Sequence, residues 1–140
     1  MIIQAYLNFA GRCEEAVEFY RRALGAEVLM MMRFKDAPEM GEPSARPPGD
    51  KIMHSAFRVG DTTLMATDGP SQGGASFSGI NLSLSVSTDA EAARCFAALS
   101  DGGQVGMPLS KTFFSSSFGT LTDRFGVSWM VLVPTEPAPS

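Results

Sequence analysis

Residues 12–25 read RCEEAVEFYRRALG, and this stretch has the pattern of one amphipathic helix that ends at a glycine. Acidic residues occupy its first turn and basic residues its last, so both ends complement the helix dipole. Gly25 is suited to the left-handed conformation that stops a helix. The apolar residues fall at the spacing of a single buried face: Ala16, Val17, Phe19, Tyr20 and Ala23. The stretch therefore predicts a helix from about Arg12 to Leu24.

Residues 88–103, TDAEAARCFAALSDGG, repeat this helical pattern. Thr88 followed by Glu91 is a capping-box sequence, and Gly102 and Gly103 end the segment. The apolar residues occupy the same five positions, shifted by 76 residues: Ala92, Ala93, Cys95, Phe96 and Leu99. Because all buried helices share such offsets, the flanking segments decide whether the chain is a true repeat.

The same order of apolar strand segments surrounds each helix, with one strand before it and three after it. The expected strands are Ile2–Phe9, Ala26–Phe34, Lys51–Val59 and Thr62–Thr67 in the first half, and Ile80–Val86, Gln104–Pro108, Phe113–Thr122 and Val127–Val133 in the second. Gly60-Asp61 and Phe125-Gly126 mark tight turns before the last strand of each half. This order predicts an α+β fold of two βαβββ half-repeats that form a curved mixed sheet around a cleft.

The turn-forming residues define the expected domain organisation. A single domain is expected over residues 1–134, with half-repeats at about 1–68 and 80–134, a Gly/Ser/Pro-rich linker at 69–79 and a disordered tail at 135–140. The proline-rich segment Asp36–Gly49 predicts a long surface loop, whose role the sequence leaves open.

Composition excludes several classes of function. With 140 residues, 44% hydrophobic and 19% charged, the chain has the profile of one globular domain. A net charge of −4 without a Lys/Arg cluster argues against nucleic-acid binding. The chain has neither an apolar run long enough to span a membrane nor the pattern of a signal peptide. Cys13 and Cys95, both in predicted helices, are interpreted as reduced thiols of a cytoplasmic protein, although a disulfide is not excluded.

A series of short segments, in this order and spacing, resembles a known superfamily. They are CEEA at 13–16 before FY at 19–20, KIMH at 51–54, LMATD at 64–68, LSLSV at 82–86, MPL at 107–109, TFF at 112–114, FG at 118–119, and TDRFGV at 122–127 before Trp129. Over about residues 3–133 the chain resembles the vicinal oxygen chelate superfamily of glyoxalase I, extradiol dioxygenases and bleomycin-resistance proteins, and within it the PhnB-like branch. The resemblance implies that a four-stranded sheet in each half curls around a cleft, and that the protein is a homodimer.

In metal-binding members of that superfamily, two strands of each half present one His or Glu apiece to a divalent cation, which acts as a Lewis acid. The positions that the resemblance assigns to these ligands are Ala5 or Tyr6, Leu64 or Met65, Asn81, and Met130. None of these side chains is an imidazole or a carboxylate, and the Asn81 amide is a weak neutral donor. We therefore expect neither a metal nor another cofactor.

His54, the only histidine, is the candidate catalytic residue. Strand alternation places His54 and Arg58 on the face opposite Met53, Phe57 and Val59, and thus toward the cleft. His54 is then a proton acceptor or an anion-orienting group. A hydrogen-bonded structural histidine is the alternative, because no carboxylate partner is evident.

Further candidate ligand-binding residues lie on predicted strands and turns. Asn81 and Ser83 belong to a polar stripe whose apolar counterpart, Ile80, Leu82, Leu84 and Val86, is expected to pack against the second helix. A solvated or dimer-facing strand is the alternative. The other candidates are Phe113 and Phe114 at a pocket mouth, Met130 on the last strand, and Asp68 in the cleft or in a turn. Trp129 and the run Met30–Met32 are expected to be core.

Two functions remain. The favoured one is a metal-independent protein that binds a small molecule; the alternative is a divergent enzyme of lyase, dioxygenase or transferase type that uses cleft residues around His54 and Asn81. PhnB-like domains have carried a demethylubiquinone methyltransferase name. That activity is not expected, because the chain has no G-x-G-x-G loop after a strand and is shorter than a typical methyl-donor domain.

Overall fold

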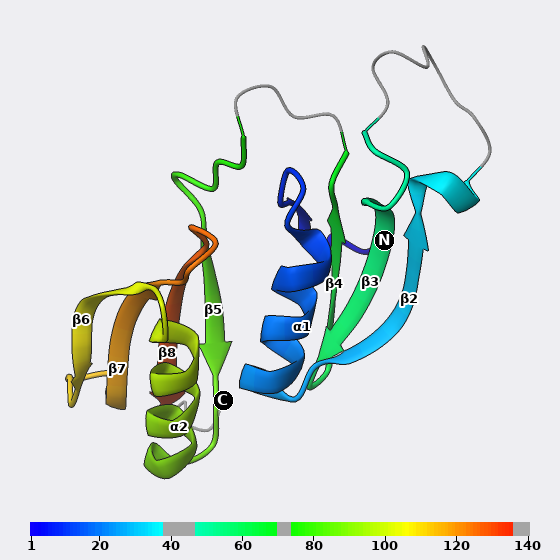
Figure 1. Cartoon of the computed structure of the whole chain (residues 1–140). Helices are drawn as coiled ribbons and strands as arrows, with labels where there is room; N and C mark the ends of the chain where they lie inside the picture. The colour runs from blue at the N-terminus through cyan, green and yellow to red at the C-terminus, as the bar shows by residue number, and fades with distance from the viewer. Residues whose placement is uncertain (38–46, 70–73, 136–140) are drawn as a thin grey trace. The chain divides into compact units, whose positions relative to one another are not determined.

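The computed structural model describes residues 1–37, 47–69 and 74–135, and the chain divides into two compact units, Met1–Ala75 and Ser76–Ser140. We call them unit 1 and unit 2 and describe each by itself. Each unit contains one four-stranded mixed sheet and one long helix (Figure 1), as the repeated sequence pattern predicts. Within the described residues, no helix is both long enough and apolar enough to cross a membrane.

Unit 1 has the strand order β1-β4-β3-β2. Its elements are β1 (Tyr6–Asn8), α1 (Cys13–Leu24), β2 (Glu27–Arg33), a short 3-10 helix (Phe34–Asp36), β3 (Ile52–Val59) and β4 (Thr62–Thr67). β1 and β4 are parallel, and the other neighbours are antiparallel. The expected first strand, Ile2–Phe9, is too long, because Ile2 and Ile3 are 81% and 95% exposed and precede the paired residues.

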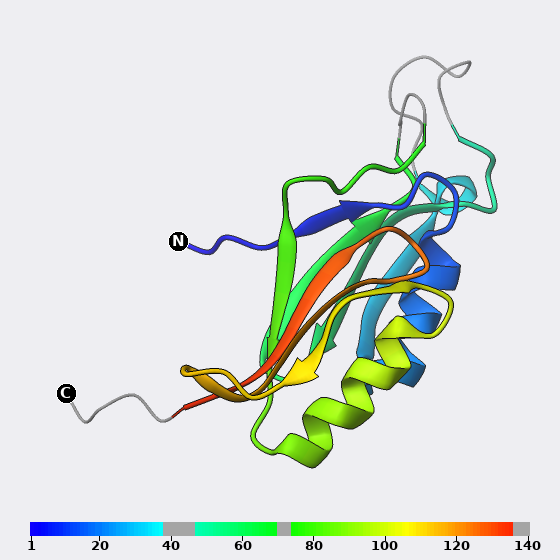
Figure 2. The ribbon, with the colours of Figure 1, turned by 90° about the vertical axis from the view of Figure 1, so that its left-hand side faces the viewer.

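Unit 2 repeats this topology with the order β5-β8-β7-β6. Its elements are β5 (Asn81–Ser85), α2 (Asp89–Ser100), β6 (Gln104–Ser110), β7 (Ser115–Thr122) and β8 (Ser128–Pro134). β5 and β8 are the parallel pair, in the place that β1 and β4 hold in unit 1. Figure 2 shows α2 to one side of the strands of its sheet. The two βαβββ half-repeats are therefore confirmed.

Parts of the predicted connectors lie outside the described residues. This applies to residues 38–46 of the predicted loop, 70–73 of the linker and 136–140 of the tail. The boundary between the units, at Ala75 and Ser76, falls within the predicted linker.

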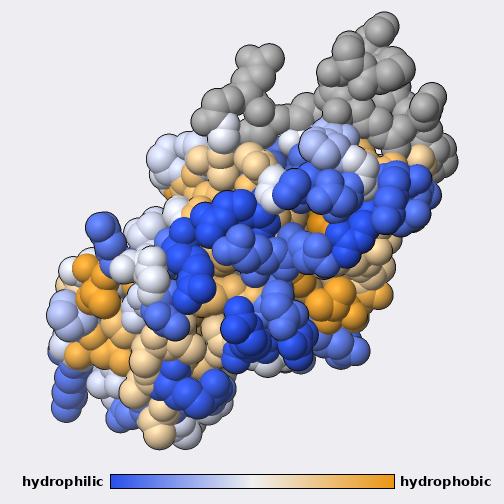
Figure 3. Space-filling model, viewed as in Figure 1, coloured by the Kyte–Doolittle hydropathy of each residue, from blue (hydrophilic) through white to orange (hydrophobic). Residues whose placement is uncertain are grey.

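Helix α1 forms the core of unit 1 with the face that the sequence predicts. All five of its expected core residues are buried, and the Tyr20 ring stacks on Phe57 of β3 with 5.9 Å between ring centroids. Gly25 ends the helix at φ 69°, and its N–H donates to the carbonyl of Arg21. The outward face of α1 is charged, and the view in Figure 3 shows it as a hydrophilic area.

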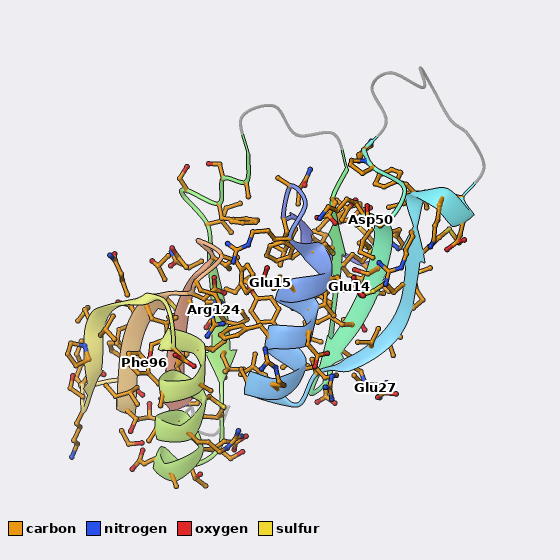
Figure 4. All side chains as sticks on the ribbon, in the orientation of Figure 1. Glu14, Glu15, Glu27, Asp50, Phe96 and Arg124 are labelled. Atoms are coloured by element: carbon orange, nitrogen blue, oxygen red, sulfur yellow. The ribbon has the colours of Figure 1, made fainter. Side chains whose placement is uncertain are left out.

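Helix α2 packs on the middle of its sheet through Phe96 (Figure 4). A Cβ atom at Gly119 of β7 would lie 2.7 Å from Phe96 Cε2, so the close approach requires glycine there. At the start of α2, the Thr88 hydroxyl accepts a hydrogen bond from the Glu91 N–H, as the capping box predicts. Ala93 is exposed, contrary to expectation, because it lies at the margin of the packed face.

Two predictions about burial are wrong. Met30–Met32 do form part of a strand, but they are not core, because β2 is the edge strand of its sheet. Val28, Leu29 and Met30 are 39%, 45% and 38% exposed. Figure 3 shows unit 1 from the side of α1. Ile80 is 66% exposed and precedes β5, so it does not pack against α2.

Candidate functional site

Asp68 is a structural residue. It is only 4% exposed, and its Oδ1 accepts hydrogen bonds from the N–H groups of Gly11 and Cys13, at 2.7 and 2.9 Å. Its Oδ2 accepts from the Ile52 N–H at 3.0 Å. The carboxylate therefore ties the start of α1 to the start of β3. Because these contacts occupy the buried carboxylate, we withdraw Asp68 from the ligand-binding candidates.

The cysteines are poor candidates for nucleophiles. Burial raises the pKa of the Cys13 thiol to about 12, although its side-chain hydrogen bond with Ser55 opposes the shift. Burial also raises the pKa of Cys95. Since the thiolate is the reactive form, both thiols stay protonated and unreactive at neutral pH.

A row of four residues crosses the sheet of unit 1. In the strand register, Tyr6 of β1 lies opposite Met65 of β4, Met65 lies opposite Ala56 of β3, and Ala56 lies opposite Met30 of β2. Residues directly opposite one another share one face of a sheet. Phe57, the next residue after Ala56, packs on α1, so the row lies on the face that α1 does not cover. We call this face the open face of unit 1 and the four residues the Tyr6–Met30 row.

The Tyr6–Met30 row is mostly apolar and accessible. Tyr6 is 53% exposed and Met30 is 38% exposed, while Ala56 and Met65 are half-buried. Ala56, the smallest of the four, lies between the longer side chains of Met30 and Met65. Unbranched, polarizable methionine side chains adapt to apolar ligands of different shape.

His54 lies on the open face beside the Tyr6–Met30 row. It pairs with Met32 of β2, and its Nδ1 lies 3.1 Å from the Tyr6 hydroxyl. The two rings meet edge to face, with 5.5 Å between centroids. The predicted face of His54 is therefore confirmed, and Tyr6 is the polar partner that the sequence did not reveal.

Arg58 shares the open face with His54 on β3, as predicted, with Ala56 between them in the strand. Its guanidinium forms an ion pair with Glu27, the residue opposite it on β2. Figure 4 shows Glu27 at the start of that strand. Both side chains of this ion pair are exposed to solvent, so the pair contributes little to stability.

Unit 2 has a row in the same topological place. Ser83 of β5 lies opposite Met130 of β8, Met130 opposite Thr120 of β7, and Thr120 opposite Met107 of β6. Asn81 is on the same face, one row away. The structure thus brings the predicted Asn81, Ser83 and Met130 together within unit 2, and His54 and Arg58 together within unit 1.

The predicted aromatic residues form a cluster at the start of β7. Phe113 is 97% exposed, and its ring contacts Phe114 edge to face at 5.1 Å. Phe114 contacts Phe118 in the same way, also at 5.1 Å. That Phe113 and Phe114 line a pocket stays a prediction. Trp129 is 4% exposed and is core, as expected.

The residues present do not fit a divalent metal site. The positions that the resemblance assigns to metal ligands offer no imidazole or carboxylate: Ala5 or Tyr6, Leu64 or Met65, Asn81, and Met130. Within residues 1–37, 47–69 and 74–135, no group of three or more His, Cys, Asp or Glu is arranged to hold a metal ion. Hard divalent cations prefer carboxylate and imidazole ligands.

The sequence did not indicate that Tyr6, Met65, Ala56 and Met30 form one row on the open face. Tyr6 and Met65 entered only as positions where a metal ligand was absent. The parallel pairing of β1 with β4 places them side by side. That pairing follows from the βαβββ order, so the predicted topology contained the signal.

The fold and the two open rows define a protein of the vicinal oxygen chelate architecture. A family model described as 3-demethylubiquinone-9 3-methyltransferase matches residues 2–132. The protein YjdN of Escherichia coli K12 is 36% identical over 140 residues, which cover 95% of each chain. The chain therefore belongs to the 3-demethylubiquinone-9 3-methyltransferase family, whose members include PhnB-like proteins.

Solved structures agree with this family. The protein PA1353 from Pseudomonas aeruginosa is 44% identical with a TM-score of 0.83, covering 96% of this chain and 98% of its own. The PhnB protein from Bacillus cereus is 27% identical with a TM-score of 0.78, covering 95% and 99%. A glyoxalase/bleomycin-resistance/dioxygenase domain from Frankia, 14% identical with a TM-score of 0.68, and the fosfomycin-resistance protein FosX from Mesorhizobium loti, 10% identical with a TM-score of 0.63, share the fold.

Proposed function

We propose that this protein binds a small, largely apolar molecule on the Tyr6–Met30 row without a metal ion. The observation that carries the proposal is the row itself, in which the thioethers of Met30 and Met65 flank the small Ala56 and the exposed Tyr6 ring ends the row. Small-molecule sites are lined mainly by apolar and aromatic side chains, with a few polar groups that orient the ligand. The Tyr6–His54 pair is such a polar group, at the edge of the row.

An enzyme of lyase, dioxygenase or transferase type is the second candidate. The observation that favours it is the hydrogen bond between Tyr6 and His54, since a positioned imidazole can accept or donate a proton. His54 and Asn81, which the sequence placed in one cleft, belong to different units. That cleft, a cytoplasmic location and a homodimer stay proposals.

Replacing Ala56 by tryptophan tests the binding function. The probe is N-phenyl-1-naphthylamine, a neutral aromatic molecule that fluoresces in apolar surroundings. The large indole occupies the space between Met30 and Met65, so we expect the dissociation constant to rise at least about tenfold, or ~1.4 kcal/mol. Fluorescence titration measures this value, and circular dichroism confirms that the variant is folded.

The matched control is Ala90→Trp, which adds the same side chain at an exposed position of α2. We expect this variant to bind the probe as the original protein does. Treatment with EDTA should leave binding unchanged. If both tryptophan variants bind the probe equally well, or if binding requires a divalent cation, the proposed site or its independence of metal is wrong.

A further inference from the structure

We infer that the Tyr6–His54 pair makes the site selective for apolar molecules that carry an anionic oxygen, such as a carboxylate, phenolate or sulfonate. This inference rests on the proposed function and specifies its ligand class. It follows from the protons that the pair can share, from the charges on the open face of unit 1, and from the position of the pair beside the Tyr6–Met30 row.

Counting protons shows that the pair is rich in hydrogen-bond donors. With a neutral imidazole, the Tyr6 O–H donates to Nδ1 and leaves Nε2–H as a donor, or Nδ1–H donates to the phenol oxygen and leaves the Tyr6 O–H free. With a protonated imidazole, Nδ1–H donates to the phenol oxygen, and both Nε2–H and the Tyr6 O–H are free to donate. Each arrangement leaves at least one donor for a ligand oxygen, and the protonated pair leaves two.

The other charges on the open face of unit 1 do not oppose an anion. Glu27 is the acidic side chain there, and its carboxylate is already paired with Arg58. Beside His54, β2 contributes Met32, and Met65 of β4 lies opposite Ala56, two residues along β3 from His54. Arg33 turns away to Glu14 on α1, an exposed ion pair that lowers the pKa of Glu14. A bound anion therefore meets donors and thioethers, without an unpaired carboxylate among the described residues of this face.

The geometry also fixes the shape of the ligand. In the donor pair, Tyr6 belongs to β1 and His54 to β3, two residues before Ala56, and the apolar row extends from Tyr6 across β4 and β3 to Met30 on β2. A ligand that covers Met65 and Ala56 while its oxygen reaches the pair needs its charged group at one end. We expect an aromatic or branched apolar body with a terminal anionic oxygen, and not a uniformly polar metabolite.

Two probes with the same ring system separate this selectivity from general apolar binding. 8-Anilinonaphthalene-1-sulfonate carries an anionic group, whereas N-phenyl-1-naphthylamine lacks it. The quantity measured is the preference, the ratio of the dissociation constant of the neutral probe to that of the sulfonate. We expect the His54→Leu substitution to lower this preference about tenfold, because a charge-assisted hydrogen bond is lost. Tyr6→Phe should lower it by a smaller factor, because the imidazole remains.

The conservative variant provides a readout that a merely structural role would not change. His54→Gln keeps an N–H donor and should restore part of the preference.

The outcomes separate the inference from the proposed function. If N-phenyl-1-naphthylamine does not bind at the Tyr6–Met30 row, the proposed function fails and the inference with it. If the neutral probe binds there but the preference is the same in the original protein, His54→Leu and Tyr6→Phe, only the inference fails. Melting temperatures of the variants show whether each retains its fold.

Discussion

Substituting Asp68 by alanine is expected to lower the free energy of unfolding by at least about 3 kcal/mol, since each buried donor left without a partner costs about 1–3 kcal/mol. The carboxylate accepts hydrogen bonds from three backbone N–H groups, those of Gly11, Cys13 and Ile52. These groups belong to the turn before α1, to its first residue and to the first residue of β3. Alanine leaves them without this acceptor, and the Cys13 and Ile52 N–H groups lie where solvent barely reaches.

Urea unfolding followed by circular dichroism measures this loss. Asp61→Ala is the matched control, because Asp61 is an exposed residue of the turn between β3 and β4. This substitution should change the free energy of unfolding by no more than about 0.5 kcal/mol. Asp68→Asn keeps one carbonyl oxygen as an acceptor, so its free energy of unfolding should lie between those of Asp68→Ala and Asp61→Ala. An Asp68→Ala variant as stable as Asp61→Ala would show that the carboxylate does not hold the two segments together.

Asp123→Ala is expected to destabilise unit 2 by at least about 3 kcal/mol for the same reason. Asp123 is 3% exposed, and its Oδ1 accepts from the N–H groups of Phe125 and Val127 in the turn before β8. Its Oδ2 accepts from the indole N–H of Trp129 at 2.9 Å. The substitution thus removes the partner of the only tryptophan in the chain.

Trp129 also provides the measurement. Its fluorescence should shift to longer wavelength in the folded Asp123→Ala variant, because water replaces the carboxylate, and the urea midpoint should fall. The control is Asp101→Ala, which removes an exposed ion pair with Arg124 (Figure 4) and should have little effect. Equal midpoints for the two variants would contradict the role of Asp123.

The fold could be predicted because its signals are local and occur twice. The helical faces around Tyr20 and Phe96, the stop at Gly25 and the cap at Thr88 are consequences of neighbouring residues, and all four are confirmed. The predicted bounds of the first strand were less accurate. Ile2 and Ile3 are residue types typical of strands, but they precede the paired residues of β1. Apolar character alone does not supply a hydrogen-bonding partner.

The candidate site could be predicted only in part, because its contacts join distant segments. Alternation correctly placed His54 and Arg58 on one face, but it could not show that the Tyr6 hydroxyl, 48 residues away, lies 3.1 Å from His54. It also could not show that Met30 is exposed, because this depends on β2 being an edge strand. The sequence leaves Asp68 either in the cleft or in a turn, and only the positions of three distant N–H groups reveal its structural role.

The central claim is that the open face of unit 1 binds an apolar molecule without a metal ion. The most direct test is methyl NMR of protein with carbon-13-labelled methionine methyl groups, freed of metals with EDTA and titrated with N-phenyl-1-naphthylamine. The signals of Met30 and Met65 should shift in proportion to probe binding, and Ala56→Trp should abolish these shifts. Probe binding that leaves the Met30 and Met65 signals in place would contradict the claim.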